Sequence, residues 1–334
     1  MKRLVLILGT LVAGVLLFGF LIGGVGWNEV WEPLRALSFL NALIIFLLTG
    51  VFILTGALRW HVILKGQGCN IPLFETVKMY LAGFALWFFA PVFLFGNELF
   101  RASSLKEQQC IDLAKGMASV LIDRILEVTS NLFVVLAGGV IFLVMGDHIS
   151  YSAKMIAAIG SIGGWLFLLA LLYIRLFQKK SIVRFFWKGT GGAQEVEEEI
   201  FQFFQLRNPA FWQGICLSLG KSIAGIARAW AIIFFFGKGF AILPAITIHA
   251  FYYLAILVPI PAALGSHDIL QAIAFGALGL GVGTGAAFAL VVRAVEMLFA
   301  VAGLALLFHF GVRLLGKLML QKGNKVIKAL GHEL

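Results

Sequence analysis

Long apolar runs separated by short polar or basic segments fill the chain from end to end. Such runs cover residues 4–25, 39–58, 116–145, 155–174, 210–236 and 286–310, and each is long enough to cross a hydrocarbon core of about 30 Å. The alternation expected of a β-barrel is absent, and only helices then satisfy the backbone in lipid. The pattern predicts an all-α polytopic membrane protein with about six full spans.

Two further apolar segments, at about 73–107 and 240–284, are broken by Pro and Gly and do not fit simple crossings. Basic clusters at 59–65, 175–188 and 313–328 indicate cytoplasmic ends, because positive residues accumulate on that face. The first broken segment must then enter and leave the membrane on the cytoplasmic side. The second lies in a stretch without Lys or Arg between Lys238 and Arg293 and opens from outside. We therefore predict two re-entrant hairpins of opposite orientation.

Polar landmarks of the first half recur 169 positions later. The related pairs are Gly56 and Gly225, Arg59 and Arg228, Gly96 and Gly265, and Arg124 and Arg293. One offset shared by four pairs indicates an internal duplication. With the opposed hairpins it predicts an inverted repeat, a design typical of transporters whose halves meet at one site.

These boundaries divide the chain into five parts. Residues 1–37 form an N-terminal membrane helix and outer loop, and residues 38–177 form the first repeat plus a connecting span. A cytoplasmic amphipathic linker occupies 178–209, the second repeat 210–312 and a basic cytoplasmic tail 313–334. Aromatic residues of the linker, among them Phe201, Phe203 and Phe204, predict pieces that lie on the membrane surface.

Composition agrees with a membrane protein: 61% of residues are hydrophobic, 13% are charged and the mean hydropathy is +1.00, whereas soluble domains carry about 25% charge. The net charge of +10 lies in short segments beside apolar runs, so it reflects topology and we expect no nucleic-acid partner. Cys69, Cys110 and Cys216 have no metal or disulfide spacing. We expect no metal and no cofactor.

Six charged residues fall in or at the edges of the spans: Arg59, Arg124, Glu127, Arg228, Arg293 and Glu296. Each costs about 2.5–3.5 kcal/mol at the centre of a bilayer, so together they exceed a typical net stability of about 5–15 kcal/mol unless paired or hydrated. The i,i+3 spacing of Arg124 with Glu127 and of Arg293 with Glu296 makes self-pairing available. Such pairs either have only the structural role of holding helices together or form part of a binding site.

Arginines near the membrane midplane suit a phosphate or carboxylate, which a guanidinium binds through two parallel hydrogen bonds. The apolar surroundings favour a substrate with hydrocarbon tails. The candidate translocation site comprises Arg59, Gly96, Glu98, Arg101, Asp123, Arg124, Glu127, Arg228, Pro261, Gly265, His267, Asp268, Arg293 and Glu296.

Three other signals are weaker. Gly220-Lys221-Ser222 matches the last three positions of the phosphate-binding loop motif, but Ile215 stands where that motif needs its first Gly. Asp123 and Glu127 have i,i+4 spacing, although the adjacent Arg124 favours an ion pair over a metal. His267 either titrates or caps a half-helix.

The charged motifs resemble those of the lysylphosphatidylglycerol synthase transmembrane-region family of flippase-like membrane proteins. The matching segments are Gly96-Asn-Glu98-Leu-Phe-Arg101, Asp123-Arg124-Ile-Leu-Glu127, Pro261-Ala-Ala-Leu-Gly265-Ser-His267-Asp268 and Arg293-Ala-Val-Glu296. The family pattern has glycines where Ala262 and Ala263 stand, and commonly Arg in place of His267. In the synthases a soluble transferase domain follows this region; here the chain ends at Leu334, so we expect no lysyl transfer.

The resemblance implies movement of a lipid or lipid-linked intermediate between the leaflets of a prokaryotic inner membrane, with both termini cytoplasmic. The leading hypothesis is a flippase for an anionic lipid or a polyprenyl-phosphate-linked intermediate. The alternatives are an intramembrane lipid-modifying enzyme and a non-transporting scaffold bound to an envelope-synthesis enzyme. The chain holds four Asp and no paired-aspartate motif for magnesium, which makes the enzyme the weaker alternative.

Overall fold

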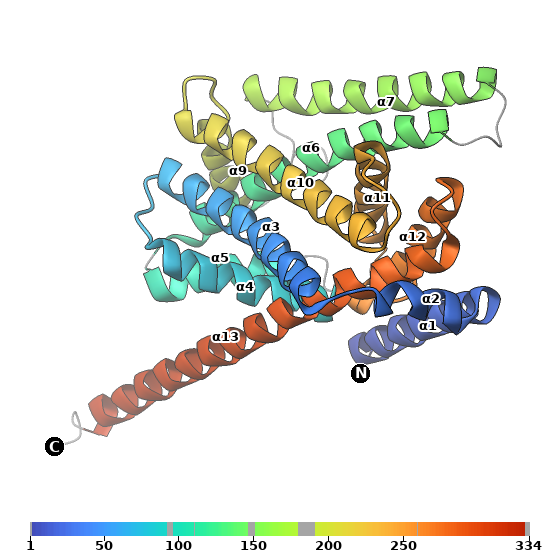
Figure 1. Ribbon diagram of the computed structural model, residues 1–334. Coiled ribbons are helices and arrows are strands. Elements are labelled where there is room, and N and C mark those ends of the chain that lie inside the picture. Colours follow the sequence, from blue (N-terminus) through green and yellow to red (C-terminus); the bar gives the residue numbers. More distant parts are fainter. Residues whose placement is uncertain are drawn as a thin grey trace.

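The computed structural model describes residues 2–91, 96–109, 111–145, 151–179, 191–258 and 260–330, and every element in these ranges is helical (Figure 1). In chain order the elements are α1 (Lys2–Val25), α2 (Trp27–Arg35), α3 (Phe39–Gly66), α4 (Leu73–Phe89), α5 (Gly96–Gln109), α6 (Leu113–Met145), α7 (Tyr151–Phe177), α9 (Gly191–Phe203), α10 (Pro209–Phe235), α11 (Ile242–Ala255), the 3-10 turn η1 (Pro261–Ala263), α12 (Ser266–Ala277) and α13 (Val282–Leu330).

Among the described residues, four helices are long and apolar enough to cross a membrane: α3, α6, α10 and the part of α13 from Val282 to Phe310. A fifth span results if α1 and α2 are counted together, although their axes differ by 90° at Gly26. The predicted class, an all-helical membrane protein, is therefore confirmed. The apolar run at 155–174 lies in α7.

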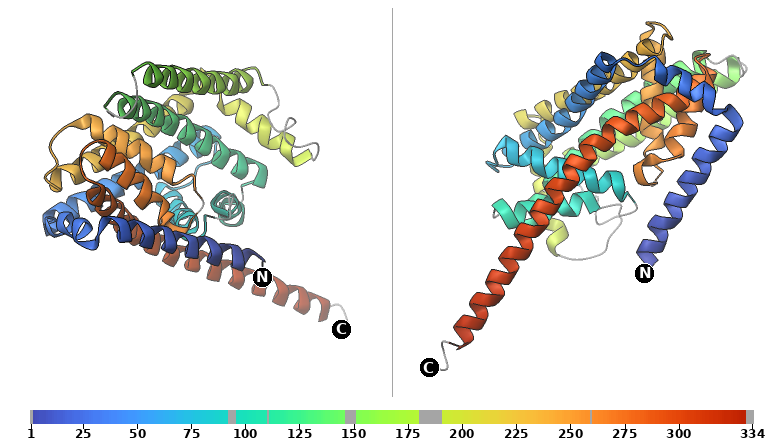
Figure 2. Two further views of the ribbon diagram at one scale, coloured as in Figure 1. Left: turned by 90° about the vertical axis from the view of Figure 1, so that its right-hand side faces the viewer. Right: turned by 60° about the horizontal axis from the view of Figure 1, so that its bottom comes forward.

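Helices α3 and α10 start at side-chain caps and pack together at the centre. Ser38 accepts a hydrogen bond from the Asn41 N–H at 3.2 Å, and Asn208 accepts one from the Ala210 N–H at 3.0 Å. These caps satisfy N–H groups that lack partners within the helix. Around α3 and α10, α4 packs on α13 and α11 on α6 (Figures 1 and 2). Elements of the first and second halves of the chain are thus interleaved.

Close contacts recur at the offset of 169 positions. A Cβ added to Gly56 would collide with the Tyr80 hydroxyl, and one added to Gly225 would collide with the His249 ring. The same offset relates a second pair of contacts, Gly116 with Ala102 and Gly285 with Gln271. Helix α3 therefore meets α4 as α10 meets α11, and α5 meets α6 as α12 meets α13.

The two segments predicted as hairpins each fold into a pair of packed helices, α4 with α5 and α11 with α12. In the first pair the connection runs through residues 92–95, which lie outside the described residues. In the second pair it contains η1 and Gly265, whose positive φ of 78° favours glycine.

The linker aromatics differ from their prediction. Phe201, Phe203 and Phe204 are buried with side chains of α6 and α10 instead of lying on a membrane surface. The apolar face of α9 finds a protein partner in α6, so burial there replaces contact with lipid. Phe185, Phe186 and Trp187, the other aromatic group of this linker, lie outside the described residues.

Gly265→Ala is expected to destabilise the fold by about 1–3 kcal/mol, because the positive φ strains an L-residue and the new Cβ would lie 2.5 Å from the Gly14 carbonyl oxygen of α1. Unfolding in detergent measures the effect. Gly139→Ala in α6, where the added Cβ has no neighbour within 4 Å, is the matched control and should be neutral or stabilising. Equal responses of the two variants would contradict the prediction.

Candidate functional site

A buried carboxylate, Asp123 of α6, holds two arginines from different helices. One carboxylate oxygen accepts from Arg59 Nε of α3 at 2.6 Å, and the other accepts from Arg101 Nη1 of α5 at 3.0 Å. Arg59 is 0% exposed, and the Arg101 guanidinium lies 3.9 Å from the centre of the Trp60 ring. Asp123 thereby links α3, α5 and α6 and offsets the cost of burying both cations.

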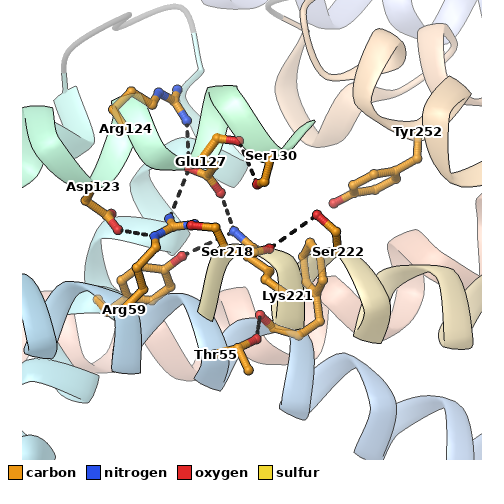
Figure 3. Close-up of polar contacts among 12 residues, drawn as sticks. Thr55, Arg59, Asp123, Arg124, Glu127, Ser130, Ser218, Lys221, Ser222 and Tyr252 are labelled. Atoms are coloured by element: carbon orange, nitrogen blue, oxygen red, sulfur yellow. Dashed lines mark hydrogen bonds and ion pairs between the residues drawn. The ribbon is translucent and has the colours of Figure 1, made fainter. Parts of the chain in front are cut away.

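One turn further along α6, Glu127 is shared by cations of three helices (Figure 3). Lys221 Nζ of α10 donates to it, and Arg124 Nη1 donates to it at 3.2 Å. Arg59 Nη2 of α3 lies 3.7 Å from the same carboxylate. The predicted pairing of Arg124 with Glu127 is therefore made, but within a larger network.

Arg124 differs from the other arginines of the network because 45% of its side chain is exposed. Its Nε lies 3.7 Å from a carboxylate oxygen of Glu98 on α5. A partly exposed guanidinium exchanges partners at lower cost than a fully buried one, because less desolvation has to be compensated. Arg124 is thus the cation of this cluster best placed to meet a ligand.

The second half contains the counterpart of the Arg59–Glu127 contact. Arg228 Nη1 of α10 donates to Glu296 of α13 at 2.8 Å, and the Tyr252 hydroxyl of α11 donates to the same oxygen at 2.9 Å. Arg228 and Glu296 lie 169 positions after Arg59 and Glu127. The contact of α3 with α6 in the first half therefore corresponds to the contact of α10 with α13 in the second, each made by an arginine and a glutamate.

Arg293 does not pair with Glu296, contrary to the self-pairing that their spacing makes available. Arg293 donates to Asp268 of α12, and its Nε donates to the Ala262 carbonyl at 3.1 Å. The same Asp268 oxygen accepts from the Gly265 N–H at 2.8 Å. The partners of Arg293 lie in the first turn of α12 and in η1 just before it, whereas Glu296 faces Arg228 of α10.

Two cavities lie beside these clusters. Cavity A, of about 80 Å³, is lined by Arg124, Glu127 and Lys221 among others. Cavity B, of about 20 Å³, is lined by residues that include Arg293 and Glu296.

Three residues belong to the lining of both cavities: Trp87, Tyr252 and Ile256. Trp87 of α4 and Ile256, directly after α11, are themselves 169 positions apart. These three side chains therefore separate cavity A from cavity B, so the charged groups beside the two cavities lie close to one another.

The remaining predicted residues have structural positions around these clusters. Gly96 begins α5, Pro261 begins η1, and His267 is buried with its Nε2 3.3 Å from the amide nitrogen of Gln271. In the described part of the chain, no three His, Cys, Asp or Glu side chains come together as a metal site requires.

Several site residues were not predicted, namely Lys221, Tyr80, Trp87, Tyr252 and the amides Asn97 and Asn131 of cavity A. The sequence did contain a signal for Lys221, because placing a lysine in an apolar span costs about as much free energy as placing the arginines that were chosen as candidate site residues. Tyr80, Trp87 and Tyr252 belong to no recurring motif, whereas Asn131, a polar residue within an apolar run, carried a signal that could have been used.

The structure defines an integral membrane protein whose interior charges are paired between helices around two adjoining cavities. The chain belongs to the family described as the lysylphosphatidylglycerol synthase TM region, which matches residues 6–303. No protein of curated function matches it.

Asp123→Asn is expected to cost about 3–5 kcal/mol of stability, because two buried arginines lose their shared charge partner. The matched control is Glu75→Gln, which removes the partially exposed Lys78–Glu75 pair of α4 and should cost about 1 kcal/mol or less. Chemical unfolding in detergent compares them. A loss for Asp123→Asn as small as the control's would show that the network contributes little to stability.

Ala262 and Ala263 have φ of 52° and 48°, a conformation that strains residues with a Cβ. The Ala262→Gly/Ala263→Gly variant should therefore gain about 1 kcal/mol of stability, since relief of strain exceeds the added freedom of the unfolded chain. Ala42→Gly, at an exposed helical position of α3, should instead lose about 1 kcal/mol. Thermal unfolding of both proteins distinguishes strain from a general effect of glycine.

Proposed function

We propose that this protein moves an anionic lipid, a phospholipid or a polyprenyl-phosphate-linked intermediate, between the two leaflets of a prokaryotic cytoplasmic membrane. The observation that carries the proposal is cavity A, where Arg124 and Lys221 face one space beside the second half's charged cluster. Membership of a lipid-related membrane family supports a lipid as the substrate.

The charges of cavity A favour an anion. Its lining holds two cations, Arg124 and Lys221, and one anion, Glu127, which both cations contact. A phosphate entering the cavity would take over hydrogen bonds from Glu127, and charge-assisted bonds to phosphate are among the stronger ones in proteins. Glu127 keeps Arg59 as a neighbour at 3.7 Å, so its own charge stays compensated during the exchange.

The topology that we propose has six spans, two re-entrant helix pairs and an inverted repeat, with both termini in the cytoplasm. The recurring contacts of α3 with α4 and of α10 with α11 support the repeat. In this scheme α4–α5 and α11–α12 are the re-entrant pairs, and the halves rock about cavities A and B to expose the lipid head group to each leaflet in turn. An envelope-synthesis enzyme is the partner that would supply or consume such a lipid.

Arg124→Ala and Lys221→Ala are expected to slow leaflet exchange of a labelled anionic lipid about tenfold or more, because each removes a charge-assisted hydrogen bond to the head group. The assay uses purified protein in phosphatidylglycerol-containing vesicles. Arg124→Lys should retain part of the activity.

Lys78→Ala is the control, since Lys78 pairs with Glu75 on α4 and lines neither cavity. The thermal unfolding of each variant is measured in parallel to verify its fold. Wild-type exchange that survives in folded Arg124→Ala and Lys221→Ala proteins would overturn the proposal.

A further inference from the structure

A third cavity lies between α6, α7 and α10, on the opposite side of α6 from cavity A. Its volume is about 360 Å³, within the range of about 300–1,000 Å³ typical of ligand sites. Apolar side chains dominate its lining, among them Phe133 of α6, Leu169 of α7 and Ile215 of α10. We call it the tail cavity.

The few polar groups of the tail cavity are already bonded within the protein. Thr129 Oγ1 donates to the Ile125 carbonyl at 2.8 Å and lies 3.1 Å from the Tyr173 hydroxyl. The hydroxyls of Ser130 and Ser218 donate to main-chain carbonyls of their own helices at 3.0 and 2.9 Å. Water needs two to four polar partners to occupy a cavity, whereas apolar cavities of this kind take apolar ligands.

The place related to the tail cavity by the offset of 169 positions lies between α13 and α3 and is filled by aromatic rings. Phe299 and Phe46 lie 169 positions from Ser130 and Ile215, and their rings stack with centroids 4.8 Å apart. Phe299 also lies 3.4 Å from where a Cβ on Gly50 would stand. The tail cavity thus exists because small or aliphatic residues replace a stacked aromatic pair, and it occurs at the contact of α6 with α10 but not at the related contact of α13 with α3.

Helix α7 forms the outer wall of the tail cavity and lies at the edge of the molecule, beside α6 (Figure 1). Its other face is apolar and exposed, with Phe167 64% and Leu168 54% accessible. In a membrane that face meets lipid chains, which are the apolar molecules at highest concentration there. A chain that enters beside α7 restores dispersion contacts that an unfilled space forfeits.

We propose that the tail cavity binds one hydrocarbon chain of a membrane lipid. The site is separate from cavities A and B, because α6 presents Leu126, Thr129 and Ser130 to the tail cavity and Arg124 and Glu127 to cavity A. The inference does not require that the protein translocates lipid. It adds a hydrocarbon site that neither the charged clusters nor the family membership assigns.

The test is photolabelling in vesicles of phosphatidylethanolamine and phosphatidylglycerol. One arm contains phosphatidylglycerol with a diazirine in the middle of an acyl chain, and the other contains polyprenyl phosphate with the same group in its chain. Mass spectrometry then locates the label. Residues 126–133 and 215–219 should be labelled in at least one arm, and the preferred arm identifies the kind of chain.

Ala170→Phe should lower that labelling about fivefold, the ratio given by about 1 kcal/mol of lost packing, because Ala170 lines the cavity and the new ring fills it. Leu168→Phe makes the same kind of change on the exposed face of α7 and should leave the labelling unchanged. Ser130→Phe, which copies Phe299 of the other half, is a second filling variant if Ala170→Phe does not fold.

Two results would overturn the proposal: labelling of 126–133 and 215–219 no greater than that of the lipid-exposed positions 167 and 168, or labelling that both filling variants leave intact. The Arg124→Ala/Lys221→Ala protein separates this proposal from translocation. It should keep the chain label while losing leaflet exchange. If the wild-type protein is labelled but shows no leaflet exchange, the tail-cavity proposal is supported and the translocation proposal is refuted.

Discussion

The structure depends on one constraint: a charge placed in hydrocarbon must find an opposite charge or a hydrogen-bond partner. Asp123 and Glu127 stand one turn apart on α6, and between them they engage cations of α3, α5 and α10. Apolar packing between helices is weakly directional in lipid, because lipid chains are as apolar as the side chains. The charge pairs therefore fix the height at which α3, α5 and α10 meet α6.

The helical class, the offset of 169 and most of the network arginines were predictable, because each follows from local composition or from spacing along the chain. Apart from the i,i+3 pair of Arg124 with Glu127, the partners of the charges were not predictable. Arg293 and Glu296 have the spacing of a self-pair, yet they bind Asp268 and Arg228, since helix crossings decide which faces meet. The burial of Phe203 of α9 depends on the neighbouring helices α6 and α10 in the same way.

The two halves share a plan but differ in charge. Lys221 stands 169 positions after Phe52, and its Nζ lies 4.8 Å from the centre of that ring. His267 stands 169 positions after Glu98, and its ring lies beside the Gln271 amide, whereas the Glu98 carboxylate lies 3.7 Å from Arg124. Cavity A is consequently the more cationic of the two neighbouring spaces, and an anion between the halves experiences an uneven potential.

Helix α13 contains Arg293 and Glu296 near its start and continues without interruption to Leu330. At about 1.5 Å per residue the helix extends roughly 50 Å beyond Glu296, and its last part stands clear of the other helices (Figure 2). An unbroken helix of this length acts as a lever arm. A rotation of about 5° at the ion pairs would displace its far end by about 4 Å, so a small rearrangement beside cavity B would become a much larger displacement at the end of the helix.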